Sequence, residues 1–419
     1  MLPLEGKLVL SIEQAIAAPF CTRQLADLGA RVIKIERPEV GDLARGYDKR
    51  VDGIASHFVW VNRSKESLAI DLKDPDGLEF IKTILPKVDI FVQNLAFGAS
   101  KRLGLDYENL KKYNPKIIVC DISGYGEGGN YGHKKAYDLL IQSESGLVSI
   151  TGTQDECVKV PISIADISAG MYAYSGILQA LLYLEKTGKG SRVEISMLEC
   201  MAEWMNYPLY YTYKNATPPE RKGAFHASIT PYGPYKAKDG VVMFGLQNPR
   251  EWESFCKIVL QDESLIEHED FKNNTLRTKN ASKVKEIIED AFKNLSAKEV
   301  VDRLDEAKIA NGNVNELNQV WEHPQLKARN RWREVDSEVG KIPALLPPAT
   351  NNNYEARMDK IPALGEHTES ILKEFGFSDK INLFKEKKDY LRILYESQKF
   401  FICSINFSRK IYKSFAKWC

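Results

Sequence analysis

The amino-acid sequence predicts an α/β protein with a doubly wound, Rossmann-like large domain and a smaller α+β domain. Roughly the first 200 residues alternate short apolar strands with helices, a rhythm typical of parallel strands joined by crossover helices. The length of 419 residues gives room for two or three domains and an ample core. After Met197 the composition changes, because Tyr, Thr, Pro and Lys become frequent, and this change predicts the end of the first domain segment.

The predicted large domain contains short apolar strands at Lys7–Ile12, Arg31–Glu36, Ser67–Asp71, Asp89–Gln93, Lys116–Asp121 and Arg192–Met197. Its predicted helices are Pro19–Leu28, Asp74–Leu85 and about Ile167–Lys186. Pro19 near the start and Gly29 after the end mark the limits of the first helix. The polar stretch from Glu39 to Arg63 is too long for a simple connection, so it is a candidate functional segment.

The predicted small domain begins with a hairpin, in which Tyr232–Lys238 and Val241–Leu246 flank a turn at Lys238-Asp239-Gly240. Three helices follow, at Glu251–Leu260, Lys283–Asn294 and Ala297–Ala307. The predicted boundaries are 1–197 for the first part of the large domain, 198–228 for a linker, 229–315 for the small domain, 316–388 for a return to the large domain and 389–419 for an atypical basic and aromatic tail.

Charge and residue usage argue against several classes of protein. Lys+Arg is 58 and Asp+Glu is 57, a balance that argues against a nucleic-acid-binding protein. The 7 Cys are scattered without a C-x-x-C motif, and the 6 His do not pair at metal-ligand spacing. We therefore expect no disulfide framework and no metal site. The N-terminus shows no signal or transit pattern and no long uncharged apolar run appears, so we expect a cytoplasmic protein without a transmembrane helix.

Asp166 is the first candidate catalytic residue. It stands where a predicted strand gives way to the apolar helix that begins near Ile167. Helical N–H groups and the helix dipole are expected to favour its ionised form. A carboxylate with apolar neighbours and little water can act as a nucleophile, although an Asp at this place is also a common helix cap.

The segment Gly124–Gly129 fits the pattern G-x-G-x-x-G and follows a predicted strand. A dinucleotide site requires a helix to begin at such a motif, whereas residues 130–134 continue as a loop. The sequence therefore favours a flexible glycine loop, a candidate lid, over NAD binding. Arg37 ends a strand at the edge where open α/β sheets bind ligands, so it is a candidate phosphate ligand. An ion pair with Glu36 or Glu39 is the alternative.

A set of short segments keeps one order from about residue 4 to residue 388. Its members are Ala18-Pro19, Leu25–Pro38, Gly41-Asp42, Arg45, Asn62–Lys65, Asp71–Lys73, Gln93-Asn94, Arg102–Gly104, Gly124–Gly126, Ala136–Asp138, Ser145–Leu147, Thr151-Gly152, Asp166, Ala169-Gly170 and Leu364–Thr368. This ordered set resembles the family III CoA-transferases, the group that includes formyl-CoA transferase and the carnitine CoA-transferases. The resemblance implies a two-domain protomer whose large domain uses both ends of the chain, and an interlocked homodimer.

The resemblance also implies a mechanism in which Asp166 is the nucleophile. The carboxylate attacks an acyl-CoA thioester to give a mixed anhydride, which CoA converts into an enzyme–CoA thioester, and the acceptor acid then reverses these steps. Coenzyme A is a co-substrate, and no permanently bound cofactor is implied. The CoA-binding positions carried over are Gln14, Ala15, Ala17, Arg37, Ile70, Asn94, Leu95, Arg102, Leu103, Lys135 and Tyr137.

The segment Val241–Trp252 resembles members that act on dicarboxylates, namely mesaconate, malate or citramalate, itaconate and glutarate, with succinyl-CoA as a common donor. Arg250 is a candidate for holding the distal carboxylate, since Arg matches that group bidentately, and an ordinary surface Arg is the alternative. Ile16 stands where formyl-CoA transferase has Gln, which argues against oxalate as the acceptor. Transfer between two acids and transfer within one dicarboxylate both stay open.

Three further alternatives stay open at the level of sequence. The α-methylacyl-CoA racemases resemble this chain, but they use a His where Tyr137 stands, and a Tyr that titrates at about 10 is a poor base for proton removal. A non-catalytic CoA-binding protein and a dehydrogenase are the other two.

The tail 389–419 suits contact with an anionic membrane surface, a docking segment or a non-native extension, because its residues 400–419 are basic and aromatic without any acid.

Overall fold

The fold is known from a computed structural model that describes residues 1–382 and residue 384. The predicted tail 389–419 and the last residues of the predicted return segment lie outside the described part of the chain. The chain divides into two compact units. The large unit contains residues 1–144, 161–204 and the described residues from 331 onward, and the small unit contains residues 145–160 and 205–330.

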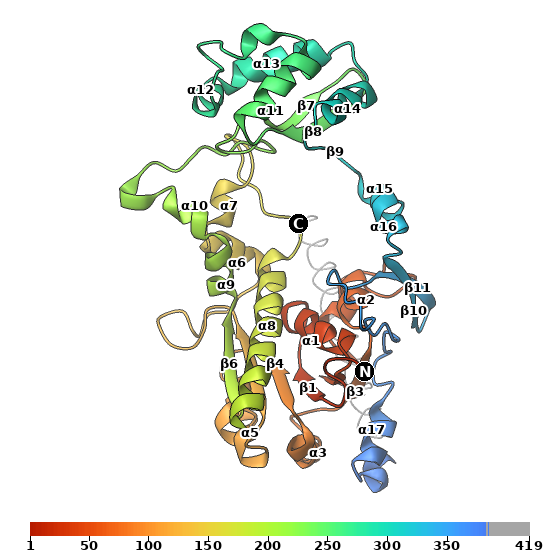
Figure 1. The fold of residues 1–419 in the computed structure, drawn as a ribbon. Coiled ribbons are helices and arrows are strands. Elements are labelled where there is room, and N and C mark those ends of the chain that lie inside the picture. Colours follow the sequence, from red (N-terminus) through yellow and green to blue (C-terminus); the bar gives the residue numbers. More distant parts are fainter. Residues whose placement is uncertain (383, 385–419) are drawn as a thin grey trace, which may run out of the picture. The chain divides into compact units, whose positions relative to one another are not determined.

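The large unit is built on a six-stranded sheet with the strand order β3-β2-β1-β4-β5-β6 (Figure 1). Every neighbouring pair of strands is parallel. The strands are β1 (Leu8–Ile12), β2 (Arg31–Glu36), β3 (Lys65–Ala69), β4 (Ile90–Gln93), β5 (Ile118–Ser123) and β6 (Ser191–Ser196). The order reverses beside β1, as it does in doubly wound folds, so the predicted parallel α/β sheet is confirmed.

The α-helices of the large unit are α1 (Ala17–Asp27), α2 (Ser56–Val61), α3 (Pro75–Ile84), α4 (Ala99–Arg102), α5 (Tyr107–Tyr113), α6 (Asp138–Glu144), α8 (Ile164–Thr187), α9 (Met197–Trp204) and α17 (Thr368–Glu374). Among the helices of the described residues, α8 alone is long and apolar enough to cross a membrane by length and composition. It packs against α1, α9 and β6 within the large unit.

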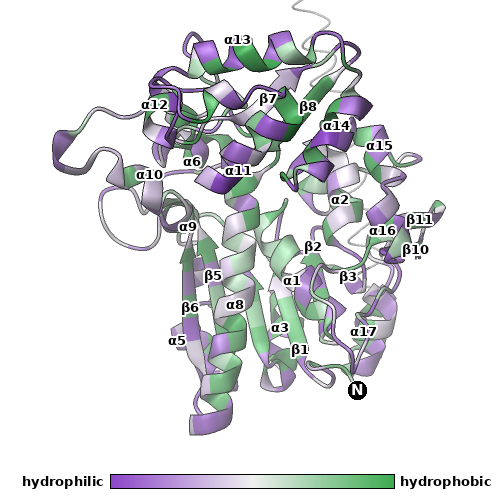
Figure 2. Ribbon diagram, turned by 45° about the horizontal axis from the view of Figure 1, so that its top comes forward, coloured by the Kyte–Doolittle hydropathy of each residue, from purple (hydrophilic) through white to green (hydrophobic). Residues whose placement is uncertain are grey.

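One face of the sheet carries an apolar core. Leu8, Leu10 and Ile12 of β1 point to this face, because side chains alternate along a strand. They join buried residues of α3, α5 and α17. Phe80 of α3 stands edge-on to Phe377, with ring centroids 5.0 Å apart. Hydrophobic residues are correspondingly frequent along the strands of the sheet (Figure 2).

The opposite face carries α1 and α8, and it buries polar side chains as well as apolar ones. Ser11, Lys34 and Ser67 occupy one row across the neighbouring strands β1, β2 and β3. All three are fully buried. The two faces of one sheet are therefore packed by different chemistry.

The edge strand β3 is covered by the chain that returns from the small unit. Ser67 N–H donates to Nδ1 of His367, and Ala69 N–H donates to the hydroxyl of Thr368. The Arg357 guanidinium donates to the carbonyls of Ala30 and Ser64. The return segment also forms a hairpin of β10 (Trp332–Ser337) and β11 (Gly340–Leu345). Backbone groups that an edge strand leaves unpaired thus find partners near the end of the described chain.

The small unit has an antiparallel sheet of β7 (Tyr232–Lys236), β8 (Val241–Gly245) and β9 (Asn311–Asn313). Its α-helices are α7 (Leu147–Ile150), α10 (Asn206–Tyr210), α11 (Pro249–Ser254), α12 (Asn274–Lys279), α13 (Ala281–Phe292), α14 (Ala297–Glu306), α15 (Leu317–Trp321) and α16 (Pro324–Ala328). Strands β7 and β8 confirm the predicted hairpin, and they pack with α11, α13 and α14 around one apolar core.

Candidate active site

The loops after β1, β2, β3 and β4 begin at one edge of the sheet, because parallel strands end on the same side. Most of the predicted CoA-binding residues lie in the segments that leave this edge. Gln14, Ala15 and Ala17 follow β1, Arg37 follows β2, Ile70 follows β3, Asn94 and Leu95 follow β4, Arg102 and Leu103 lie at the end of α4, and Lys135 and Tyr137 lie in the long loop after β5. Predicted residues that are far apart in the sequence thus lie in segments that leave the same side of the sheet, where its strands end.

The turn after β1, defined as residues 13–17, is held by its neighbours. Gln14 N–H donates to Oδ1 of Asn94 over 2.9 Å, and Nδ2 of Asn94 donates back to the Gln14 carbonyl over 2.9 Å. Ala15 is left-handed, with φ of 64°, and its N–H donates to Oδ1 of Asp42 over 2.8 Å. The structure therefore joins Gln14 directly to Asn94, two of the predicted residues.

The other predicted residues differ in how they are presented. Arg37, Arg102 and Lys135 are exposed cations, and Tyr137 is 69% exposed. These side chains are accessible to a ligand. Ile70 is only 2% exposed and packs into the apolar core instead, so its side chain is not presented at the edge. The suggested pairing of Arg37 with Glu36 is wrong, because Glu36 pairs with Arg45.

Asp166 lies in the first turn of α8, which begins at Ile164, three residues earlier than predicted. It does not cap the helix. The Asp138 carboxylate accepts the N–H of Ala165 over 2.8 Å, and Nε2 of Gln142 donates to its second oxygen over 2.7 Å. No hydrogen bond reaches the Asp166 carboxylate from the residues that the structure describes.

The pKa of Asp166 is raised to about 7 by burial and by the charge of Asp138. The expectation that this position favours the ionised form is therefore wrong, since desolvation and a like charge outweigh the helix dipole. A carboxyl group with this pKa is about half ionised at neutral pH. Once ionised, it is a stronger base and a better nucleophile than an ordinary carboxylate.

Tyr47 was not singled out from the sequence. Burial raises its pKa, and the charges of Asp42, Asp166 and Tyr137 raise it further, so this phenol shares the electrostatic environment of the candidate nucleophile. Its ring meets His57 edge-on, with centroids 5.5 Å apart. The only signal in the sequence was the length of the polar stretch from Glu39 to Arg63, which named no residue.

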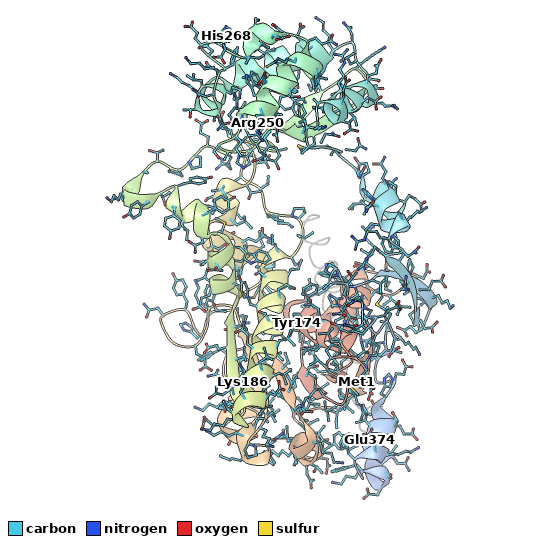
Figure 3. All side chains as sticks on the ribbon, in the orientation of Figure 1. Met1, Tyr174, Lys186, Arg250, His268 and Glu374 are labelled. Carbon is cyan, nitrogen blue, oxygen red and sulfur yellow. The ribbon has the colours of Figure 1, made fainter. Side chains whose placement is uncertain are left out.

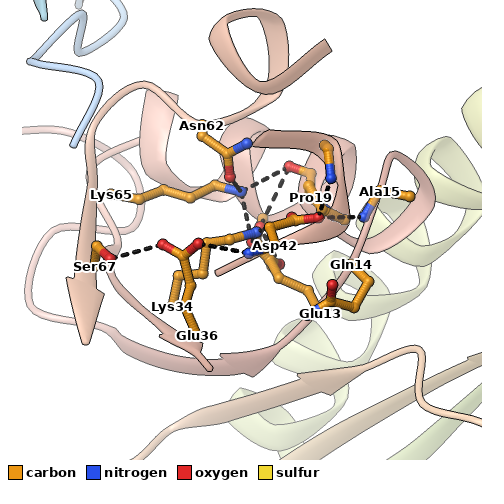
Figure 4. Close-up of polar contacts among 12 residues, drawn as sticks. Glu13, Gln14, Ala15, Pro19, Lys34, Glu36, Asp42, Asn62, Lys65 and Ser67 are labelled. Atoms are coloured by element: carbon orange, nitrogen blue, oxygen red, sulfur yellow. Dashed lines mark hydrogen bonds and ion pairs between the residues drawn. The ribbon is translucent and has the colours of Figure 1, made fainter. Parts of the chain in front are cut away.

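A buried network of charges lies behind the turn after β1 (Figure 4). Glu13 accepts from Lys65 over 2.7 Å and from Lys34 over 3.2 Å. Lys34 also donates to Asp42 over 2.6 Å. The two lysines hold the pKa of Glu13 at about 2 despite its burial. None of these charged residues was singled out as buried from the sequence, because their partners lie far apart in the sequence.

The glycine segment Gly124–Gly129 forms a loop, as predicted. Strand β5 ends at Ser123, and the next helix, α6, begins at Asp138. Gly126 and Gly128 have φ of 80° and 84°, in the left-handed region that glycine enters at little cost. No helix therefore begins at the motif to receive a pyrophosphate.

In the small unit, Arg250 lies in the first turn of α11 and is exposed (Figure 3). Asn248 caps this helix by accepting the N–H of Glu251. The position of Arg250 in α11 is thus fixed by the cap, and its guanidinium is accessible.

Comparison with known proteins identifies the family to which this fold and this site belong. Residues 4–368 match the family model described as CoA-transferase family III, so the chain belongs to this family and is an enzyme of this kind. It is 33% identical over 378 residues to the succinyl-CoA:glutarate CoA-transferase of Homo sapiens, covering 89% of this chain and 86% of the relative. An acetyl-CoA:oxalate CoA-transferase of Acetobacter aceti is 32% identical over 378 residues, with 89% and 96% covered.

A solved structure, a CAIB/BAIF family protein from Brucella suis, aligns with a TM-score of 0.79 at 29% identity. The alignment covers 89% of this chain and 99% of that protein. The non-catalytic protein and the dehydrogenase are therefore set aside as alternatives.

Proposed function

We propose that this enzyme transfers CoA from succinyl-CoA, or a similar dicarboxylyl-CoA, to a short dicarboxylic acid, with Asp166 as the covalent nucleophile. The observation that carries this proposal is the environment of Asp166. Its carboxyl group is partly buried beside Asp138, receives no hydrogen bond within the described chain, and has a pKa near 7. Such a group is poorly stabilised as an anion and is therefore reactive towards a thioester carbonyl.

The reaction proceeds through four exchanges at carbonyl carbon. The ionised Asp166 attacks the thioester, CoA leaves as a thiolate, and a mixed anhydride forms. The thiolate attacks the aspartyl carbonyl, the first acid leaves as a carboxylate, and an enzyme–CoA thioester remains. The acceptor carboxylate displaces the thiolate to form a second anhydride, and the thiolate then takes the new acyl group and restores Asp166. No proton or electron is gained or lost in the overall exchange.

Two physical requirements follow from these intermediates. The thiolate must stay bound close to the anhydride, so that each recapture is effectively unimolecular. Water must be kept away, because anhydrides and thioesters hydrolyse. We assign the first requirement to the proposed CoA-binding residues at the sheet edge, and the second to the loop Gly124–Gly129 as a shield.

For CoA itself, the exposed cations Arg37 and Arg102 suit the phosphates, since Arg binds phosphate oxygens bidentately. Gln14, Ala15 and Ala17, together with Lys135 and Tyr137, suit the pantetheine and the thioester. Asn94 acts by holding Gln14. Leu95, on the proposed adenine side, and Leu103, proposed with Arg102 as a second nucleotide contact, are partly buried against the apolar core.

The proposed acceptor class is supported by the names of two relatives, which act on glutarate and on oxalate, both dicarboxylic acids. Arg250 is the proposed partner of the distal carboxylate. We place glutarate and other acids of similar length before oxalate, because Ile16 lacks the amide that formyl-CoA transferase has at this position.

The test is a CoA-exchange assay read by mass spectrometry. The purified protein is mixed with succinyl-CoA and one acid at a time from a panel that includes glutarate, mesaconate, itaconate, malate, citramalate and oxalate. A new acyl-CoA made by the wild type but not by Asp166→Ala is the expected result. In single turnover, the wild type also gains the mass of CoA on the peptide that contains Asp166. Product formation by Asp166→Ala would refute the nucleophile.

The same proposal includes a homodimer in the cytoplasm. Exposed apolar side chains on α6 and α8, among them Leu139, Leu140, Met171 and Leu182, support self-association. Light scattering behind size exclusion measures the mass, and a monomer at micromolar concentration would refute the dimer. Fractionation of cells tests the location.

A further inference from the structure

We propose that Asp42 is a positioning residue for the turn after β1, and that it presents the side-chain NH2 of Gln14 to bound acyl-CoA. This inference rests on the proposed function, because it assigns the turn to CoA binding. Asp42 itself is 1% exposed, so it acts through the turn and does not touch the ligand.

Asp42 joins the loops that follow two neighbouring strands. Its Oδ1 accepts the N–H of Ala15 over 2.8 Å and the N–H of Ala44 over 2.9 Å. Its Oδ2 accepts from Nζ of Lys34 over 2.6 Å. One carboxylate therefore fixes the turn after β1 against the segment after β2, and both of its oxygens are occupied.

The turn needs such a support because of its backbone. Ala15 is left-handed, with φ of 64°, a conformation that costs a residue other than glycine about 1 kcal/mol or more. The charge-assisted bond from its N–H to Asp42 offsets that cost. Without the carboxylate, the turn is free to relax towards a more common conformation.

The same support fixes the Gln14 carboxamide. The N–H of Leu43, the residue after Asp42, donates to Oε1 of Gln14 over 2.9 Å. A backbone N–H only donates, so the accepting atom is the oxygen and the NH2 group occupies the other position. Asn94 takes both backbone groups of Gln14.

Its side-chain NH2 is then the one polar group of Gln14 without a partner among the described residues. It is available to donate to an acceptor on the ligand, such as the thioester carbonyl or a pantetheine amide oxygen.

The buried charges behind Asp42 hold its carboxylate in place. Lys34 is fully buried between Asp42 and Glu13, and Glu13 is shared with Lys65 (Figure 4). Lys65 also donates to the carbonyl of Pro19 in the first turn of α1. The network therefore ties the turn to β2, β3 and α1, three elements that the sheet already fixes.

The test compares Asp42→Asn with a matched control, Asp27→Asn. Asp27 is also a buried carboxylate held by cations, Arg23 and Arg63, but it lies at the far end of α1 from the turn. Both variants lose a buried ionic contact, so both are expected to lose stability. Only Asp42→Asn places an amide NH2 against Lys34 and disturbs the turn.

Three measurements separate positioning from stability. Titration calorimetry with CoA alone should give about tenfold weaker binding for Asp42→Asn, the size of one lost charge-assisted hydrogen bond, and no change for Asp27→Asn. Hydrogen exchange should quicken at the amide of Ala15 only in Asp42→Asn. In a double-mutant cycle, Asp42→Asn should have little further effect on the KM for succinyl-CoA once Gln14→Ala is present.

Each outcome decides something. Equal CoA affinity in Asp42→Asn and Asp27→Asn, or additive effects of Asp42→Asn and Gln14→Ala, would overturn the positioning role. If the wild type binds CoA tightly, Asp42→Asn weakens it, and no acid of the panel yields product, the proposed transfer fails while the positioning role stands. A wild type that does not bind CoA overturns both.

Discussion

On one face of the six-stranded sheet, α3, α5 and α17 bury aliphatic and aromatic side chains, whereas on the other face α1 covers a row of buried polar residues. The apolar face packs by the complementary shape of its side chains. The polar face buries the charged side chains of Glu13, Lys34 and Lys65. A stable sheet does not require such buried ion pairs.

The difference between the two faces shows which contacts fix the geometry of the backbone. Apolar packing tolerates substitutions of similar volume, because its attraction has no direction. Hydrogen-bonded ion pairs fix distances and angles, so they hold the turn after β1 in one shape. The helix that follows Gln14, α1, and the helix that carries Asp166, α8, cover the face whose contacts are directional.

The largest expected effect separates catalysis from stability. Asp166→Asn removes the nucleophile, so kcat should fall by about 10³-fold or more. The free energy of unfolding at pH 8 should stay equal or rise, because the variant lacks an ionised carboxylate that burial and Asp138 disfavour. Steady-state kinetics and urea unfolding measure the two quantities. Loss of both activity and stability together would contradict the assignment.

The apolar face should show the opposite pattern. Phe80 is fully buried, and Phe80→Ala should lower the free energy of unfolding by about 3–5 kcal/mol. The KM and kcat of the folded enzyme should change little, because the ring packs against Phe375 and Phe377 within the apolar core. Phe80→Leu is the control, with a clearly smaller loss of stability. A changed KM in Phe80→Ala would break the separation of the two faces.

The polar face should be sensitive to a change of charge at constant shape. Glu13→Gln leaves Lys34 and Lys65 buried with one acceptor charge fewer, so stability at pH 7 should fall by about 3 kcal/mol. Glu66→Gln is the matched control, since Glu66 pairs with the partly exposed Arg31 and should cost at most about 1 kcal/mol.

The pH dependence of this loss has a definite sign. The pKa of Glu13 is lowered to about 2 in the fold, so its stabilisation is present above the ordinary value of 4.5 and is lost as pH falls towards 2. The difference in stability between the wild type and Glu13→Gln should therefore shrink across that range. A difference that is the same at pH 3 and pH 7 would show that charge is not the cause.

A smaller effect concerns the pH profile of the reaction. Because Asp166 acts when ionised and its pKa is about 7, kcat/KM should rise with pH through 7. At pH 6 it should be about tenfold below its plateau. Asp138→Asn removes the neighbouring charge and should shift the midpoint to lower pH. A midpoint near 4 in the wild type would contradict a raised pKa.

Most strands of the large unit were predictable because their patterns are local. The predicted strand Arg31–Glu36 coincides with β2, and Lys7–Ile12 differs from β1 by one residue. The predicted strand Ser67–Asp71 was two residues late, because β3 begins at Lys65. A lysine there looks like a loop residue until Glu13, 52 positions away, is seen to neutralise it.

The site was predictable in position but not in electrostatics. The family resemblance implied roles for Asp166 and Gln14. The raised pKa of Asp166 depends on burial and then on the charge of Asp138, which lies on another helix and takes the capping bond that Asp166 was expected to take. The raised pKa of Tyr47 likewise comes from burial and from groups that the fold brings near it. The spacing of residues in the sequence does not predict these electrostatic effects.

The cover over β3 has a consequence for synthesis of the chain. Residues 357–368, which supply partners to Ser64, Ser67 and Ala69, leave the ribosome almost 300 residues after that strand. Until then the nascent sheet has an open edge, a template on which neighbouring chains can add strands. Translation of the return segment therefore sets the earliest moment at which the large unit is safe from aggregation.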